Sequence, residues 1–442
     1  MAEDNDNSQL LAKAKEVLQN NRHGKHTIPA EGIYPHQWFW DSCFIAIGLA
    51  NYDTKRAQDE LLSLIEGQWH NGMIPHMVFD PGAFYRQDRE LWRSQISPYS
   101  PDERATSGIT QPPILAEAVI RIGKKLPKHE RLLWYRKMYR PLIRHHSWLY
   151  RDRDPNNTGL VINLHPWETG MDDSPPWILA INKIQLPLWI KLIEILKFDK
   201  LIEKLRRDTK TVPTTQREST IDGLALLSVM QRIRRREYST KKILKSKLLA
   251  IEDVGFNSIL IRNNHHLEKI AKALDEQLPE QLQTSISKAD KALMELWNEN
   301  GRTFYSRNFY NKEAIELESI ASLLPLYSGS ISQESADLLA KKLANDIKFK
   351  AKYPAPSMSK DSGHYNPERF WQGPTWVNTN WFLIDGLERY GHTKQADSLR
   401  KSTIDMVAKG SFYEYYSPEY GKPEGAKNFS WTAALIIDLA SK

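Results

Sequence analysis

Apolar residues recur along most of this chain at spacings of three and four, which is the period of an amphipathic helix. Alternation with a period of two is confined to short pieces such as 160–163 and 303–305. The pattern therefore predicts an all-α fold with local ribbons only. The predicted helices cover 8–19, 38–50, 54–65, 112–122, 128–150, 177–196, 221–236, 252–275, 283–298, 313–327, 332–347, 376–391, 394–408 and 429–441.

The helices are separated by loops of irregular length, and no self-similarity appears at a period of ~34 or ~40 residues. This argues against a helical solenoid and favours a closed toroid of paired helices, formed by a single domain over residues 1–442. Residues 198–251 differ because they are rich in Thr, Arg and Lys. We expect them to form a basic helical lid inserted in that domain. The chain has no glycine pattern of the Rossmann or P-loop type.

Charge and composition exclude several classes of function. The 442 residues include 61 Lys and Arg against 54 Asp and Glu, so the net charge is only +7, concentrated between 191 and 272. We interpret this excess as a solvated basic face or a pocket for an anionic ligand, and expect no nucleic-acid partner. No stretch reaches the ~18 apolar residues of a membrane helix. The polar N-terminus does not resemble a signal peptide.

The single Cys43 can form neither an intramolecular disulfide nor, alone, a zinc site. We therefore expect a cytoplasmic protein with a small-molecule partner and no membrane partner. Assembly into a homo-oligomer stays open.

Four segments combine aromatic residues, carboxylates and glycine: GIYPHQWFWDSCF (32–44), NLHPWETGMDDSPPW (163–177), YNPERFWQGPTWVNTNW (365–381) and FYEYYSPEYGKPEGAKNFSW (412–431). Functional residues concentrate on loops held by a rigid scaffold. Indole rings stack on the C–H faces of sugars, although a single Trp at helical spacing is more often core. The aromatic residues next to acids or amides in these segments are Trp38, Trp40, Trp167, Trp371 and Trp376.

The carboxylates in these segments suggest acid–base chemistry. Hydrolysis of a glycoside needs one protonated acid at the leaving oxygen and a second carboxylate on the opposite face of the ring. Asp172 follows Gly170 in a loop whose apolar surroundings would raise its pKa. Its neighbour Asp173 is an alternative, and either residue could instead cap a helix. Glu414 lies between aromatic residues, and Asp41 follows Trp40; a surface ion pair and a helix cap are their ordinary roles.

The strings YPHQWFWDS, HPWETGMDDSP, RFWQGPTWVNTNW and FYEYY followed by NFSWTAA resemble glycoside hydrolase family 63. Within it they are similar to the short bacterial enzymes that hydrolyse mannosylglycerate and glucosylglycerate. The resemblance extends over nearly the whole chain. It implies an (α/α)6 barrel, an inverting mechanism, and catalysis without a metal or an organic cofactor.

The resemblance also implies roles for individual residues. Asp172 matches the general acid of the family and Glu414 its general base. Asp173 occupies a position where relatives commonly have Asn, and Gln372 replaces a more frequent Arg. The matching sugar-contacting positions are Tyr34, Trp38, Phe39, Trp40, Asp41, Gln111, Gly170, Phe370 and Trp371, with Tyr85 as a mobile-loop tyrosine.

RRDT (206–209) followed by QREST (216–220) resembles the insert in which an Arg of the family meets the glycerate carboxylate. Arg206 and Arg207 are the candidates for that contact.

Three alternatives remain open from the sequence. A neutral α-disaccharide hydrolase of the trehalase type would need no anion-binding Arg. A sugar epimerase on a similar toroid would use paired histidines, and the His145/His146 and His265/His266 pairs lie in predicted helices. A basic helical-repeat protein that binds a macromolecule would leave the four aromatic segments unexplained.

Overall fold

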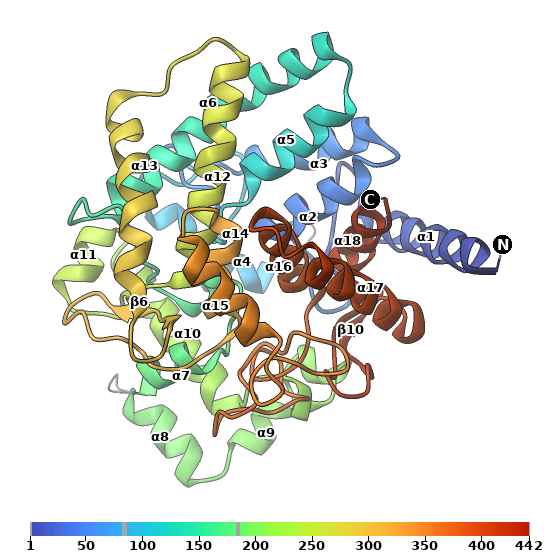
Figure 1. Cartoon of the computed structure of the whole chain (residues 1–442). Coiled ribbons are helices and arrows are strands. Elements are labelled where there is room, and N and C mark those ends of the chain that lie inside the picture. Colours follow the sequence, from blue (N-terminus) through green and yellow to red (C-terminus); the bar gives the residue numbers. More distant parts are fainter. Residues whose placement is uncertain (1, 82–85, 183–185, 442) are drawn as a thin grey trace.

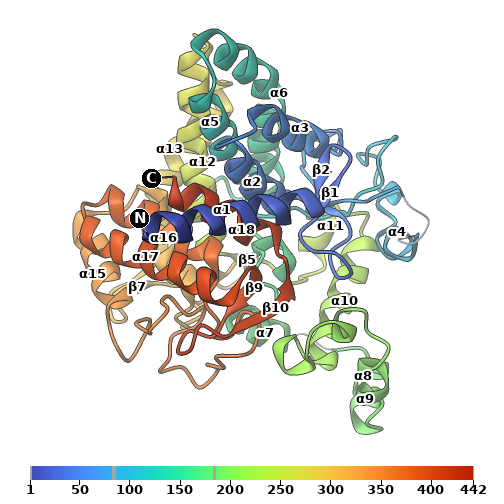
Figure 2. The same cartoon turned by 90° about the vertical axis from the view of Figure 1, so that its right-hand side faces the viewer.

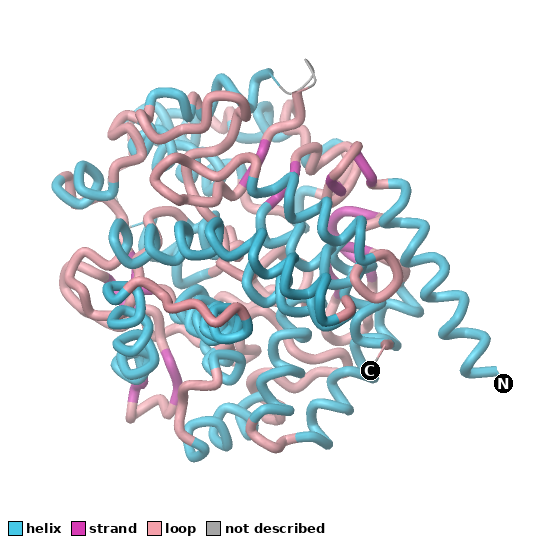
Figure 3. Tube along the Cα trace, turned by 90° about the horizontal axis from the view of Figure 1, so that it is seen from above, coloured by secondary structure: helices cyan, strands magenta, loops and turns pink. Residues whose placement is uncertain are grey.

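The computed structural model describes residues 2–81, 86–182 and 186–441, and most of them lie in helices joined by long loops (Figures 1 and 3). The helices are α1 (Ala2–Asn20), α2 (Phe39–Leu49), α3 (Thr54–Ile65), α4 (Arg86–Trp92), α5 (Leu115–Lys125), α6 (Lys128–Arg153), α7 (Pro175–Asn182), α8 (Leu188–Ile195), α9 (Asp199–Glu203), α10 (Thr220–Arg234), α11 (Thr240–Lys245), α12 (Val254–Ala273), α13 (Glu280–Ala292), α14 (Pro325–Ser328), α15 (Gln333–Leu343), α16 (Val377–Arg389), α17 (Thr393–Gly410) and α18 (Ser430–Ala440).

Short strands form two-stranded antiparallel ribbons at the ends of these helices. The pairs are β1 (Arg22–His23) with β2 (His26–Thr27), β3 (Gln37–Trp38) with β4 (Met77–Val78), β5 (Ile251–Glu252) with β8 (Arg307–Asn308), β6 (Trp297–Asn298) with β7 (Thr303–Phe304), and β9 (Tyr413–Tyr416) with β10 (Pro423–Lys427). The expectation of a mainly helical fold with local ribbons is confirmed.

An inner set of helices packs in a closed cycle, in which α2 contacts α5, α5 contacts α12, α12 contacts α14, α14 contacts α16, α16 contacts α18, and α18 returns to α2 (Figure 1). Helices α2 and α16 are buried along almost their whole length, and α18 along all but its last residue. A helix that is apolar on every face is stable only when neighbours cover all of it. Outer helices supply that cover: α3 packs on α2, α6 on α5, α13 on α12, α17 on α16 and α1 on α18.

Most predicted helices are found within a few residues of their expected bounds, but three differ. The predicted helix 177–196 is split, because Pro187 is the N-cap of α8. The predicted helix 283–298 ends at Ala292 and continues as a 3₁₀ turn and a strand.

The predicted helix 313–327 is wrong. Its first half is extended and pairs with other segments through the bridges Arg307↔Ala314 and Ser319↔Met358. Only a 3₁₀ turn (Ile320–Leu323) and the single turn of α14 remain helical. Pro325 explains the boundary, since proline has no N–H to donate and is tolerated only in the first turn of a helix.

Helices α8 and α9 lie at the periphery, away from the inner helices (Figure 2). They expose several large apolar side chains, among them Leu188 at 76%, Ile195 at 72% and Leu201 at 59%. Helix α10 follows them and carries the chain back toward the body. Within the described part of the chain, no helix combines the length and the apolarity that crossing a membrane requires.

Candidate active site

A small pocket, about 30 Å³ in volume, brings the four aromatic segments together. Its walls come from the start of α2, the loops around 111, 170 and 371, the strand β9 and the start of α18. The lining residues are Pro29, Tyr34, Trp38, Trp40, Asp41, Gln111, Gly170, Asp172, Phe370, Trp371, Trp376, Glu414, Phe429 and Trp431. The pocket therefore combines three carboxyl groups with aromatic walls, as the sequence predicts.

Glu414 is held by the β9–β10 ribbon, whose register shifts between Glu424 and Lys427. The shift is a β-bulge, and Gly425 adopts a φ of +73° within it. A Cβ at Gly425 would lie 2.6 Å from Glu414 Oε2, so only glycine leaves room for the carboxylate. The backbone N–H of Ala426 donates to the same oxygen at 2.9 Å. The bulge thus aims Glu414 at the pocket and fixes it there.

Asp172 lies in the loop that follows a 3₁₀ turn (Pro166–Thr169). Gly170 ends that turn at a φ of +71°, and a Cβ there would meet the Trp40 indole at 2.4 Å. This close approach packs the loop against the aromatic wall. Burial raises the pKa of Asp172 well above its ordinary value, and the nearby carboxylates of Glu218 and Asp173 raise it further. A carboxyl group with a raised pKa holds its proton to a higher pH than an ordinary aspartate does.

Asp173 faces away from the pocket and has a structural role. It is fully buried, whereas Asp172 is partly exposed. One oxygen of Asp173 accepts from the backbone N–H of Trp371 at 2.9 Å and the other from Gln372 Nε2 at 3.2 Å. Asp173 therefore anchors the loop that carries the aromatic wall, and Gln372 is part of that anchor.

Asp41 belongs to the first turn of α2, with its side chain buried at the pocket. Burial raises the pKa of Asp41 well above its ordinary value, and the carboxylates of Glu414 and Asp172 contribute to the rise. Gln111 lines the same pocket, and its side-chain oxygen accepts from the backbone N–H of Trp40 at 3.3 Å. These groups can form hydrogen bonds with the hydroxyls of a sugar ring.

The aromatic wall is rigid because its rings pack on one another. Trp371 and Trp376 stack with ring centroids 3.8 Å apart and an interplanar angle of 2°. Trp40 lies 6.3 Å from Trp371 and contacts Trp431 edge-on at 5.2 Å. Such a wall suits the apolar face of a pyranose.

Comparison with known proteins agrees with this chemistry. A family model for the mannosylglycerate hydrolase MGH1-like glycoside hydrolase domain matches residues 34–432. A mannosylglycerate hydrolase of Thermus thermophilus is 37% identical over 428 residues, which make up 96% of this chain and 99% of that enzyme. The chain belongs to the MGH1-like glycoside hydrolases. They fall within glycoside hydrolase family 63.

Two further relatives fit the same assignment. A glucosylglycerate hydrolase of Mycolicibacterium hassiacum is 31% identical over 98% of this chain and 97% of that enzyme. The crystal structure of a family 63 mannosylglycerate hydrolase from Thermus thermophilus, in complex with Tris and D-glycerate, superposes with a TM-score of 0.87 at 35% identity. That match covers 97% of this chain and 99% of the other. This MGH1-like chain is therefore a glycosidase.

Some residues predicted for the site of this MGH1-like enzyme do not line the pocket. Phe39 is fully buried and packs edge-on against His145 of α6, so it supports α2 and does not line the pocket. Trp167 packs with His165 and Trp92 in a neighbouring cluster. Tyr85 lies outside the described residues.

Neither predicted glycerate-binding arginine reaches the pocket lining. Arg206 is paired with Asp208 and Glu218, and Arg207 with Asp88. Both cations are neutralised by local partners within the insert or beside it.

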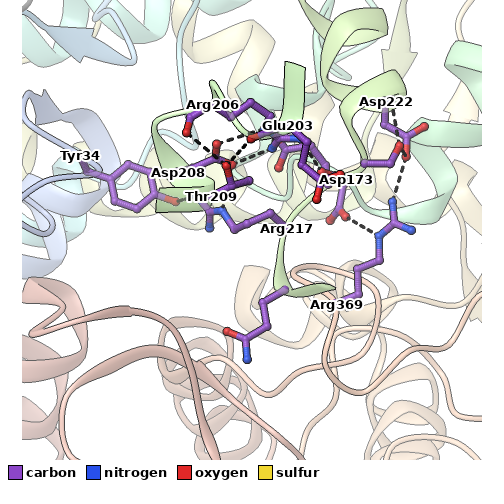
Figure 4. Close-up of polar contacts among 12 residues, drawn as sticks. Tyr34, Asp173, Glu203, Arg206, Asp208, Thr209, Arg217, Asp222 and Arg369 are labelled. Carbon is purple, nitrogen blue, oxygen red and sulfur yellow. Dashed lines mark hydrogen bonds and ion pairs between the residues drawn. The ribbon is translucent and has the colours of Figure 1, made fainter. Parts of the chain in front are cut away.

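The cation that does contact Glu414 is Arg217, which was not among the predicted site residues. Figure 4 shows the Arg217 side chain beside Asp208. Arg217 is 5% exposed, and its Nη1 lies 3.2 Å from each oxygen of Glu414. Its Nη2 donates to the Tyr34 hydroxyl, and the guanidinium lies 4.5 Å from the Phe370 ring. The QREST string contains Arg217, but the prediction favoured RRDT because that string has two adjacent arginines.

The histidine pairs are not arranged for catalysis. His145 and His146 are buried in α6, and burial lowers the pKa of both, that of His146 to about 4. His266 on α12 pairs with Glu117, and His265 with Asp290. None of these four lines the pocket. Over the described ranges, no group of three or more His, Cys, Asp or Glu side chains could hold a metal ion.

Proposed function

We propose that this enzyme hydrolyses a small α-glycoside of glycerate, mannosylglycerate or glucosylglycerate, on an (α/α)6 barrel formed by the inner and outer helices. The observation that carries the proposal is a buried arginine beside a pocket that contains three carboxyl groups and a stacked indole wall. The carboxyl groups supply acid–base chemistry and the indoles bind a sugar. The arginine supplies a site for an anionic aglycone.

Asp172 acts as the general acid in this proposal. Its raised pKa keeps the proton on the carboxyl group until the glycosidic oxygen accepts it. The bond between the anomeric carbon and that oxygen then breaks, and glycerate leaves with the proton of Asp172. Asp173 takes no part because both of its oxygens are engaged by the 371–372 loop.

Glu414 acts as the general base. It accepts a proton from a water molecule whose oxygen forms the new bond to the anomeric carbon, on the face opposite the leaving group. This single displacement inverts the anomeric configuration. The proton gained by Glu414 returns to solvent, and Asp172 is reprotonated.

Arg217, and neither Arg206 nor Arg207, binds the glycerate carboxylate in this proposal. A guanidinium and a carboxylate form two parallel hydrogen bonds, which fix orientation as well as charge. The insert 198–251 would then act as a lid that brings Arg217 to the pocket. D-glycerate bound in the Thermus enzyme supports an aglycone of this kind.

A trehalase-like activity on a neutral disaccharide is the second candidate. Asp41, Gln111 and the indole wall would serve either substrate. The buried guanidinium favours the anionic one, because its Nε–H has no hydrogen-bond partner among the described residues and can donate to a further carboxylate.

A comparison of kcat/KM on mannosylglycerate, glucosylglycerate, trehalose and kojibiose, read by released sugar, tests the proposal. We expect one of the glycerate glycosides to be the best substrate by at least ~10-fold, the cost of about one charge-assisted contact. A preference for trehalose or kojibiose would contradict the anionic aglycone and support the neutral one.

A further inference from the structure

Every acceptor site of the catalytic carboxylate is occupied in this structure. A carboxylate offers about four lone-pair sites. Glu414 Oε1 accepts from the Tyr34 hydroxyl at 2.7 Å and from Arg217 at 3.2 Å. Its Oε2 accepts from Arg217 at 3.2 Å and from the Ala426 N–H at 2.9 Å. Glu414 has no acceptor site left for the proton of an attacking water.

Arg217, in contrast, still has an N–H donor that makes no hydrogen bond within the described part of the chain. A guanidinium carries five N–H groups. Arg217 Nε is buried and has no hydrogen-bond partner among the described residues. Its nearest acid at that edge is Asp208, at 3.6 Å, beyond hydrogen-bond distance. The guanidinium can therefore take a second carboxylate while it is still close to Glu414.

Asp208, the acid beside Arg217 Nε, is already hydrogen-bonded to Arg206. Asp208 accepts two hydrogen bonds from Arg206, at 3.1 and 2.7 Å, and Arg206 also donates to the backbone oxygen of Glu218 at 2.9 Å (Figure 4). Arg217 is therefore paired with two carboxylates, Glu414 at 3.2 Å and Asp208 at 3.6 Å, and Arg206 already offsets the charge of Asp208. An incoming anion competes mainly with Glu414, which makes the shorter contact.

We propose that the carboxylate of the substrate activates the base by exchange: it pairs with Arg217, withdraws the guanidinium from Glu414, and so frees an acceptor site for the attacking water. The inference rests on the proposed function. It makes Arg217 a specificity-determining residue that acts on turnover as well as on binding. A neutral aglycone brings no replacement charge, and breaking a buried ion pair without replacement is strongly unfavourable.

An α-glycosyl fluoride of mannose or glucose separates activation from binding, because it has no aglycone and leaves the Arg217 site open. Its hydrolysis breaks the bond between the anomeric carbon and fluorine and forms a bond to a water oxygen. Fluoride leaves, and Glu414 takes the water proton. We expect free D-glycerate to raise kcat on the fluoride by at least ~10-fold, as when the competent state changes from a minor to the major population. Uncharged glycerol should have no such effect.

Variants sharpen the experiment. Arg217→Ala should hydrolyse the fluoride at a rate that D-glycerate no longer changes, and at least as fast as the unactivated wild type. Lys204→Ala removes an exposed cation of the same insert, and should leave both the basal rate and the activation unchanged. The wild-type measurement decides the matter even if Arg217→Ala does not fold.

The outcomes are distinguishable. Simple inhibition by D-glycerate, or no effect while the fluoride is turned over, would overturn the exchange. A wild-type enzyme that hydrolyses neither the fluorides nor the glycerate glycosides would instead contradict the proposed function.

Discussion

At the scale of single residues, the adjacent Asp172 and Asp173 differ only in what surrounds them. We expect Asp172→Asn to lower kcat on a glycerate glycoside by at least ~10²–10⁴-fold, because an amide cannot deliver the proton. Asp173→Asn should be milder, since it keeps the acceptor for the Trp371 backbone N–H and disturbs the Gln372 contact and the 3.6 Å ion pair with Arg369. Steady-state kinetics of both variants checks this. An active Asp172→Asn beside an inactive Asp173→Asn would reverse the two roles.

Glu60 on α3 is a second buried carboxyl group whose ionisation matters. It accepts from the Ser42 hydroxyl at 2.6 Å and from Gln37, and so supports the segment that carries Trp38 and Asp41. Burial raises its pKa to about 7. A glutamate in the unfolded chain ionises near ~4.3. The folded state therefore loses stability as the pH rises from ~4.3 to about 7, and the loss stays constant above pH 7.

Glu60→Gln should remove this pH dependence while keeping the acceptor oxygen. We expect the variant to match the wild type near pH 4 and to be more stable by up to ~3 kcal/mol above pH 7. Urea unfolding at a series of pH values measures the difference. The exposed Glu16→Gln on α1 is the control and should show no such trend. A gap that stays constant with pH would show that the pKa of Glu60 is the same in the folded and the unfolded chain.

At the scale of helices, the contact of α2 with α18 depends on one glycine. A Cβ at Gly48 would lie 2.5 Å from the Ala434 backbone, which cannot move aside as a flexible side chain can. Gly48→Ala should therefore destabilise the fold by ~1–3 kcal/mol, as overpacking does. Denaturant unfolding reads the effect.

A matched control comes from Gly223 on α10, where a Cβ would meet nothing closer than Glu218 at 3.7 Å. Gly223→Ala should stabilise the protein by ~0.5–1 kcal/mol, because alanine restricts the unfolded chain and favours the helix. Equal effects of the two substitutions would show that Gly48 is not a packing constraint.

At the scale of the whole molecule, the proposed acid Asp172 and base Glu414 lie 242 positions apart in the sequence, and only the arrangement of the helices sets their separation. An inverting enzyme keeps the two carboxyl groups ~6.5–9.5 Å apart so that water enters between them. We expect proton NMR early in the reaction to show the β-anomer released first from an α-linked substrate. Early appearance of the α-anomer, or a glycosyl ester trapped on Glu414, would exclude the water-activating role.

The sequence alone determined the features that depend on local order. Apolar spacing reflects the 3.6-residue turn, so it located most helices. It failed at 313–327, where Pro325 and pairing with distant segments replaced a helix that local apolar spacing favours. The four aromatic segments could be recognised as candidate site segments, because loops rich in tryptophan, glycine and acidic residues are hard to explain as hydrophobic core.

Only the tertiary structure decided which of several similar residues lines the pocket or contacts Glu414. Asp172 and Asp173 are neighbours in sequence, yet the 371–372 loop engages one and leaves the other exposed to the pocket. Arg206, Arg207 and Arg217 are chemically identical, yet only Arg217 contacts Glu414, across 197 positions. Residue type and spacing carry no information on such a contact, because it depends on how the insert, the β9–β10 ribbon and the start of α2 pack against one another.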